Sequence, residues 1–328
     1  MGAVELRGAI QHYAWGDPSF LPEMLGVDPD GRPWAELWLG THPSGMTTVT
    51  GDGAALVDLT GPLRYLLKVL CAAEPLSMQC HPNAQQAIDG FRRGVYPDDQ
   101  AKPELIVALT EFSALCGLRP VDDSIQLLRS IGCDELADRL ADSGPFEVLG
   151  DLYRGRIDPI PVIDAAVGHA GRDDRLIHIA DLAERYPGQA SVVVAILLNH
   201  VVLSPGQALH LTAGNLHAYL SGSGIELMGA SDNVVRGGLT VKHVDVDELL
   251  TIVDPTPLAE PILASDGRSY ALPEAGVVLH RLGVGETHTS HGHELAVALD
   301  GTQVYLPDGT RWTAPAEAFV VTDITSGV

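Results

Sequence analysis

The feature that most constrains the fold is a repeated pattern of short apolar segments, each bounded by turn-forming residues. In the first 118 residues the turns include Gly16-Asp17, Asp30-Gly31 and Gly51-Asp52-Gly53. Regularly spaced short strands of this kind are typical of a β-sandwich or a β-barrel. The predicted strands of this part cover residues 4–6, 36–39, 46–49, 66–70, 76–80 and 105–109.

A helical block interrupts this pattern between residues 120 and 190. Asp122 offers a cap to a helix that ends at Gly132, and Asp134 opens another helix that ends at the break Ser143-Gly144-Pro145. Further helices are expected over residues 146–153, 162–168 and 176–186. Strand signals return at residues 200–203 and continue to 246, and a last block of short strands follows a proline-rich link.

These patterns predict a mainly β chain with a helical insert. Because 328 residues are too many for one compact core, we expect more than one structural unit. The expected division is a main β-barrel formed by residues 1–119 and 191–254, a helical insert at 120–190, and a smaller β-domain at 255–328.

Composition excludes several classes of protein. The formal net charge of −23 argues against nucleic acid as a partner. The longest apolar run is broken by Asn199 and His200 and is too short to cross a bilayer, so we expect no membrane contact and a cytoplasmic location. The four cysteines have no close spacing, which indicates neither a disulfide framework nor a cysteine zinc site.

Lysine is scarce in this chain. Only Lys68, Lys102 and Lys242 are lysines among the 20 basic residues. A compact, titratable amine serves different purposes from a guanidinium, so these positions are candidates for function, although chance is the simpler explanation for any one of them.

Three segments carry side chains suited to a metal. Ser77, Gln79 and His81 alternate along a predicted strand and therefore share one face. Glu104 stands at the start of another predicted strand, and His217 alternates with Tyr219 in a third; Zn²⁺ accepts nitrogen and oxygen ligands of these types. Taken singly, the first three residues are also compatible with a hydrogen-bonded or solvated face, and Glu104 with a surface charge.

The segment from residue 229 to Lys242 is a candidate anion site. Asp232 belongs to a turn, and glycines 237 and 238 leave the backbone open beside Arg236. A guanidinium can bind phosphate with two hydrogen bonds, and Lys242 adds a point charge. An isolated arginine in a loop is more often simply solvated.

Taken together, these segments resemble the type I phosphomannose isomerases. The resemblance runs in order from about residue 5 to 250. The motifs that carry it are AELWLGTHPSG (35–45), LLKVLCAAEPLSMQCHP (66–82), KPELIVAL (102–109), FSALCGLRP (112–120), GNLHAYLSG (214–222) and ASDNVVRGGLTVKHVDV (230–246).

The resemblance implies a fold and a reaction. The fold is a cupin-type, jelly-roll catalytic β-barrel with a helical domain and a smaller cupin-like C-terminal domain. The reaction is a zinc-dependent interconversion of mannose 6-phosphate and fructose 6-phosphate through a cis-enediol, with a phosphorylated hexose as substrate. A monomer is expected, with a homodimer as the alternative.

The family's functional positions fall on residues already singled out here, except for Glu226, which the resemblance alone implies. One zinc ion per chain is implied on Gln79, His81, Glu104 and His217. Substrate-binding positions are Ser77, Tyr219, Asp232 and Lys242, and candidates for catalysis are Arg236, Glu226 and Lys102. The choice of the proton-transferring base between Glu226 and Lys102 stays open.

The sequence departs from the family pattern in two places. Residues 96–101 lack the Asn-His pair common before the KPE motif. The C-terminal part is short, and its histidines His288, His291 and His293 resemble a second cupin metal motif, although an exposed histidine-rich turn is the favoured interpretation. The alternatives for function are an isomerase for another aldose or aldose phosphate, and a non-catalytic sugar-binding cupin.

Overall fold

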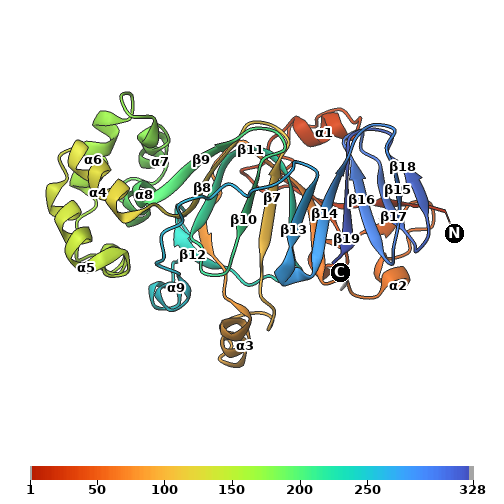
Figure 1. Ribbon diagram of the computed structural model, residues 1–328, viewed down its shortest axis with the longest axis horizontal. Helices are drawn as coiled ribbons and strands as arrows, with labels where there is room; N and C mark the ends of the chain where they lie inside the picture. The colour runs from red at the N-terminus through yellow and green to blue at the C-terminus, as the bar shows by residue number, and fades with distance from the viewer. Residues whose placement is uncertain (1, 325–328) are drawn as a thin grey trace.

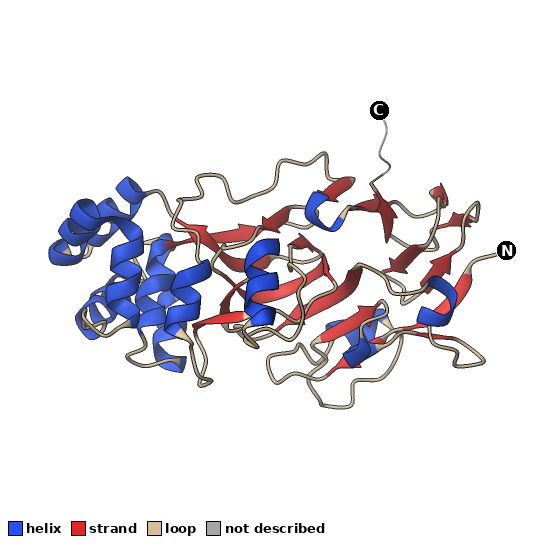
Figure 2. Cartoon of the chain, turned by 90° about the horizontal axis from the view of Figure 1, so that it is seen from below, coloured by secondary structure: helices blue, strands red, loops and turns tan. Residues whose placement is uncertain are grey.

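Two β-sheet layers lie side by side in the computed structural model, which describes residues 2–324, and a group of helices covers one end (Figure 1). Seen from below, most of the helices gather at the end of the molecule opposite the N-terminus (Figure 2). No helix in the described part of the chain is long and apolar enough to cross a membrane.

The first layer is a ten-stranded sheet organised around its longest strand. The second half of this 13-residue strand, β11, pairs with β5 and β7, and its first half pairs with β6 and β8. The pairing shifts at a bulge between Tyr219 and Ser221, so one strand links the two parts of the sheet. The strands are β2 (Ala9–Gln11), β3 (Glu36–Leu39), β5 (Tyr65–Ala72), β6 (Met78–Cys80), β7 (Glu104–Ala108), β8 (Phe112–Leu118), β9 (Leu198–Leu203), β10 (Ala208–Leu211), β11 (His217–Gly229) and β12 (Val235–Gly238).

The two faces of this sheet have different chemistry. Val69 of β5 and Ile225 of β11 are fully buried and belong to the core shared with the second layer. Because alternate residues of a strand point to opposite faces, Lys68 and Glu226, which are direct cross-strand partners, lie on the other face. That face carries the charged groups described below.

The second layer is a seven-stranded sheet in the order β13-β14-β19-β16-β17-β1-β4. Two of its strands come from the beginning of the chain, since β1 pairs with β17 and with β4. The described part of the segment 255–328, which was expected to form a β-domain of its own, therefore shares this sheet with N-terminal residues. The strands are β1 (Val4–Arg7), β4 (Thr48–Val49), β13 (Ser269–Leu272), β14 (Val277–Leu282), β16 (Glu294–Ala298), β17 (Gln303–Leu306) and β19 (Ala318–Asp323), with β15 (Thr287–Thr289) and β18 (Arg311–Thr313) forming a separate pair.

The helical layer is built from α4 (Val121–Ser130), α5 (Asp134–Tyr153), α6 (Ile160–His169), α7 (Ile179–Arg185) and α8 (Ala190–Leu197). The break predicted in the second helix is confirmed, because Gly144 interrupts α5 with a φ of 77°. Helix α8 lies in the segment expected to belong to the β-barrel, yet its residues 192–197 are buried in the helical core. Short helices elsewhere are α1 (Phe20–Met24), α2 (Val57–Thr60), α3 (Ala84–Arg92), α9 (Val246–Ile252) and the 3₁₀ turns η1 (Pro43–Gly45), η2 (Asp174–Leu176) and η3 (Pro273–Ala275).

Candidate functional site

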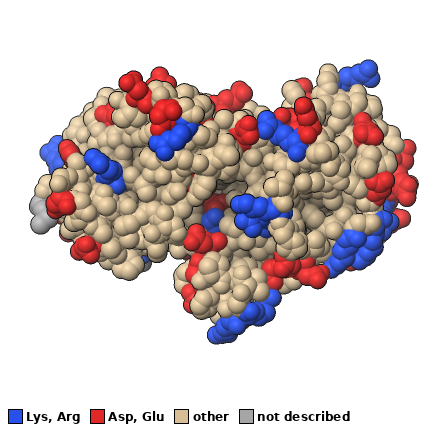
Figure 3. Space-filling view, turned by 180° about the vertical axis from the view of Figure 1, so that it is seen from behind, with Lys and Arg blue, Asp and Glu red and all other residues tan. Residues whose placement is uncertain are grey.

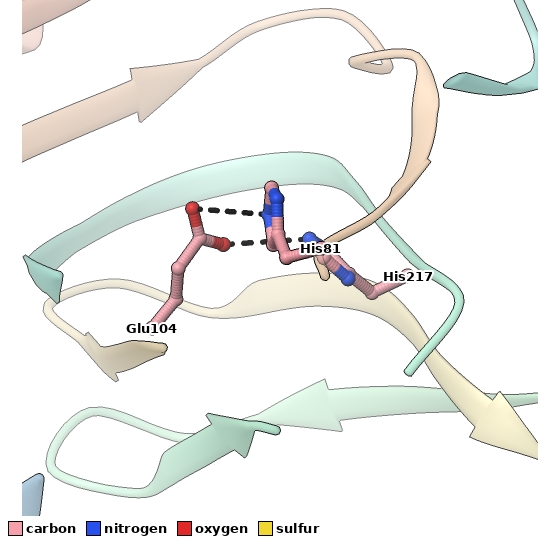
Figure 4. A group of neighbouring side chains, drawn as sticks. All are labelled: His81, Glu104 and His217. Atoms are coloured by element: carbon pink, nitrogen blue, oxygen red, sulfur yellow. Dashed lines mark ion pairs between the residues drawn. The ribbon is translucent and has the colours of Figure 1, made fainter. Parts of the chain in front are cut away.

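Three buried side chains from different strands meet at one point of the ten-stranded sheet (Figure 4). His81 follows β6, Glu104 begins β7 and His217 begins β11. Nε2 of His81 lies 3.3 Å from Oε1 of Glu104, and Nε2 of His217 lies 3.4 Å from Oε2 of the same carboxylate. Each residue is only 1% exposed. The strand pairing thus brings together donors that are far apart in sequence.

Both histidines are held by their other ring nitrogen. Nδ1 of His81 is 2.8 Å from the carbonyl oxygen of Asn233, and Nδ1 of His217 is 2.9 Å from that of Asn215. Since a carbonyl only accepts hydrogen bonds, each Nδ1 carries a proton, and Nε2, which faces Glu104, is the ring nitrogen that a metal could bind. Burial lowers the pKa of His81 to about 4, which keeps the ring neutral.

The donor atoms that face one another in this group fit a metal cation. Nε2 of both histidines and Oε2 of Glu104 are buried without a hydrogen-bond partner, which is costly unless an ion satisfies them. Two ligands about 2.1 Å from a tetrahedral zinc ion lie about 3.4 Å apart, which agrees with the 3.3 and 3.4 Å separations found here. The donor set and its spacing therefore suit zinc.

The fourth expected ligand lies beside this group. Gln79 in β6 is the direct cross-strand partner of His217, so the two side chains share a face of the sheet. Gln79 is also paired with Arg236 of β12, and both residues line the adjoining cavity.

A cavity of about 590 Å³ adjoins this group of side chains and has Glu104 in its wall. A hollow near the middle of one face of the molecule, with basic side chains beside it, is visible in Figure 3. His81 and His217 do not line the cavity but contact Glu104, which does. The expected site residues that line it are Ser77, Gln79, Lys102, Glu104, Tyr219, Glu226, Asp232, Arg236 and Lys242.

A buried charge cluster that was not predicted forms part of the cavity wall. Nζ of Lys68 is 2.9 Å from Oε2 of Glu226 and 3.4 Å from Oε1 of Glu36. The indole N–H of Trp38 donates to Oε2 of Glu36 at 2.7 Å. Of these residues only Glu226 was expected in the site, although the scarcity of lysine had marked Lys68 as unusual.

Burial and charge act in opposite directions within this cluster. Burial raises the pKa of Glu226, and the neighbouring Lys68 ammonium counteracts this. For Lys68, burial alone would lower the pKa, but Glu226 and Glu36 together raise it above its usual value. The lysine is therefore held as a cation between two carboxyl groups.

Lys102 and Tyr219 lie close to the group of His81, Glu104 and His217, with the rings of Tyr219 and His217 6.2 Å apart between centroids. Nζ of Lys102 is 2.9 Å from Oε1 of Glu104. Burial is the first reason that the pKa of Tyr219 lies well above its usual value, so the hydroxyl keeps its proton. At the rim, Nε2 of His42, another residue that the sequence had not indicated, is 3.3 Å from Oδ2 of Asp232.

Comparisons with known proteins give the family of this chain. The model of the type I phosphomannose isomerase catalytic domain matches residues 4–121. The mannose-6-phosphate isomerase of Salmonella typhimurium (strain LT2) is 32% identical, with 94% of this chain and 91% of that protein covered. The chain belongs to the type I phosphomannose isomerase family. The human mannose-6-phosphate isomerase is 31% identical, with 77% of this chain and 73% of that protein covered.

Solved structures of this family share the fold of the whole chain. A mannose 6-phosphate isomerase bound with zinc and yttrium has a TM-score of 0.86 at 26% identity, with 98% of this chain and 100% of that chain covered. The Salmonella typhimurium enzyme bound to substrate and zinc has a TM-score of 0.85 at 26% identity and the same coverage. The family resemblance and the mainly β, cupin-like fold class expected from the sequence are thereby confirmed.

The C-terminal histidines of this family member do not assemble into a second centre. Nε2 of His288 is 2.5 Å from Oε2 of Glu294, and Nδ1 of His293 is 2.6 Å from the hydroxyl of Tyr305. Within residues 2–324, the group around Glu104 is the one place where three or more His, Cys, Asp or Glu donors converge. His288 and His293 therefore form separate hydrogen bonds with different partners.

Proposed function

We propose that this chain interconverts mannose 6-phosphate and fructose 6-phosphate and holds one zinc ion on Gln79, His81, Glu104 and His217. The observation that carries the proposal is the buried group of histidine and glutamate atoms that lack protein partners at the base of a polar cavity. The activity named for the relatives, and the solved relative bound to substrate and zinc, support the same assignment.

Bound zinc supplies a Lewis acid that polarises substrate oxygens. Ser77, Tyr219 and Asp232 line the cavity with groups that can bind sugar hydroxyls. The net charge of −23 repels a phosphorylated sugar at long range, so the phosphate needs local cations. Lys242 is exposed at the cavity rim and suits that role, whereas Arg236, paired with Gln79, belongs nearer the metal.

Isomerisation needs a group that moves a proton between C1 and C2. A general acid or base works best when its pKa is close to the operating pH. Glu226 is favoured because burial raises the pKa of its carboxyl group and because it lines the cavity. Lys102 is the alternative, although its ammonium is already paired with Glu104.

A coupled isomerase assay with and without a chelator tests this function. We expect turnover of mannose 6-phosphate that a chelator abolishes and added zinc restores. Full turnover by protein shown to be metal-free by elemental analysis would overturn the zinc assignment.

The same assay with other substrates tests the identity of the sugar. Free mannose and glucose 6-phosphate are expected to react far more slowly than mannose 6-phosphate. Preference for either one would favour an isomerase for another aldose, and absence of turnover on all three would favour a sugar-binding protein.

A further inference from the structure

The loop between β11 and β12 connects the metal centre to the substrate cavity. Asp232 of this loop lines the cavity, and the next residue, Asn233, offers its carbonyl oxygen to Nδ1 of His81 at 2.8 Å. That hydrogen bond sets which ring nitrogen of His81 carries the proton and therefore which one can bind a metal. The position of this loop thus determines whether His81 is ready to bind zinc.

One carboxylate from another part of the chain holds three consecutive residues of this loop. Oδ1 of Asp98 accepts hydrogen bonds from the Ser231 hydroxyl at 2.8 Å and from Nδ2 of Asn233 at 3.2 Å. Oδ2 accepts from the backbone N–H of Asp232 at 3.0 Å. The backbone carbonyl of Asp98 accepts a further bond from Nδ2 of Asn233 at 2.9 Å.

Two of the three held residues, Ser231 and Asn233, are buried, whereas Asp232 is exposed. Besides Asp98, both buried side chains donate to the carbonyl oxygen of Gln100, at 3.1 and 2.8 Å. Ser231 is 1% exposed and Asn233 is 0% exposed. Hydrogen bonds to an ionised acceptor are stronger than those between neutral groups. Without the carboxylate of Asp98, the Ser231 hydroxyl and the Asp232 N–H lose their charged acceptor, and only bonds to the backbone carbonyls of residues 98 and 100 still hold the loop. The Asn233 carbonyl is then less firmly fixed against His81.

We propose that Asp98 is a positioning residue for the zinc centre: it fixes the loop of residues 231–233 so that the Asn233 carbonyl holds His81 in its metal-binding orientation. The same contacts fix Asp232 at the cavity. This inference rests on the proposed zinc site. It assigns a role to the segment before Lys102, in which the family's usual Asn-His pair is absent.

The test compares the zinc affinity of two alanine variants of the full-length protein. Asp98→Ala removes the four hydrogen bonds that the carboxylate accepts, one of which comes from the backbone N–H of Gln100. The matched control is Asp99→Ala, which removes the same charge from the next residue, whose carboxylate accepts a bond from Nε2 of Gln100 alone. Zinc affinity is measured by competition with a chromophoric chelator, and circular dichroism of the metal-free proteins checks folding.

Asp98→Ala is expected to bind zinc roughly 10- to 100-fold more weakly than the wild type, the usual effect of losing a residue that supports a metal ligand. The zinc affinity of Asp99→Ala is expected to stay within about twofold of that of the wild type. With zinc in large excess, kcat of Asp98→Ala should recover more fully than its KM, because Asp232 stays less well fixed.

Three outcomes separate this inference from the proposed function. Equal zinc affinity in wild type and Asp98→Ala overturns the positioning role while leaving the zinc site intact. Equal weakening of zinc binding in Asp98→Ala and Asp99→Ala also overturns the positioning role, because the loss of one negative charge then explains the effect. A wild-type protein that does not bind zinc overturns the proposed site itself. If Asp98→Ala is unfolded, Ser231→Ala removes one of the same contacts and is expected to weaken zinc binding in the same direction.

Discussion

Replacing Lys68 with methionine removes a buried ammonium and keeps an unbranched side chain. Lys68, Glu36 and Glu226 are 6%, 5% and 3% exposed, so the carboxyl groups cannot turn to solvent after the change. The variant therefore leaves two carboxyl groups facing each other across the space that the ammonium filled.

The distances set the size of the effect. At an effective dielectric constant of about 20, Coulomb's law gives about 6 kcal/mol for the 2.9 Å pair with Glu226 and about 5 kcal/mol for the 3.4 Å pair with Glu36. Desolvation of the ammonium offsets much of this, and removing one partner of a buried ion pair costs roughly 3–5 kcal/mol. We expect Lys68→Met to lose that much stability at pH 8.

The loss should depend on pH in a defined direction. Burial already raises the pKa of Glu226, and without Lys68 that pKa rises further. A carboxyl group whose pKa is raised on folding stabilises the protein below its unfolded pKa, near 4.3, and this contribution is lost as pH rises through the folded value. The variant should therefore be most destabilised at pH 8 and approach the wild type toward pH 5.

Urea unfolding followed by tryptophan fluorescence at pH 5 and pH 8 measures the difference. Lys242→Met is the matched control, because Lys242 is exposed and its loss should change stability by no more than about 0.5 kcal/mol. A loss of the same size at both pH values, or no loss at either, would refute the reasoning.

Three further predictions concern separate parts of the molecule. Arg236→Ala should lower kcat far more than it raises KM in steady-state assays, and near-normal turnover would remove Arg236 from the mechanism. Burial lowers the pKa of His178 to about 3. Because the unfolded chain then binds a proton that the folded protein does not, the free energy of unfolding falls by about 1.4 kcal/mol per pH unit as pH falls from 6.5 toward 3. Urea titrations should show a shallower acid slope for His178→Phe, and an unchanged slope contradicts the assignment. Asn83 caps α3, since its side chain accepts from the N–H of Gln86 at 2.9 Å, and Asn83→Ala should cost about 1 kcal/mol in chemical unfolding; a loss below about 0.3 kcal/mol would show that the cap is dispensable.

The sequence was most informative where the signal is local. Alternation placed Ser77 and Gln79 on one face of a strand, and both line the cavity in the structure. The capping pair Asn83 and Gln86 was an equally local signal for α3, which was not predicted. The break at Gly144 was readable because a glycine before a proline rarely continues a helix.

The sequence was least informative where tertiary pairing decides. Lys68 and Glu226 meet because β5 and β11 pair in one register, and nothing local to either strand shows this. The apolar residues of α8, rich in valine, fall in the segment 191–254 that was assigned to the barrel, and no helix was predicted there; they are helical, and the helical layer buries most of the segment. Side-chain packing overrides intrinsic propensity at such positions.

The pairing of β1 with β17 has a consequence for biosynthesis. Residues 4–7 leave the ribosome long before residues 303–306, which form their partner strand. The apolar face of the ten-stranded sheet is likewise covered by strands β13, β14, β16, β17 and β19, which are made after the strands of that sheet. The chain therefore cannot complete its core during translation by folding the metal-bearing sheet alone. These late strands contribute none of the expected metal ligands, yet they cover the apolar face of the sheet that carries those ligands.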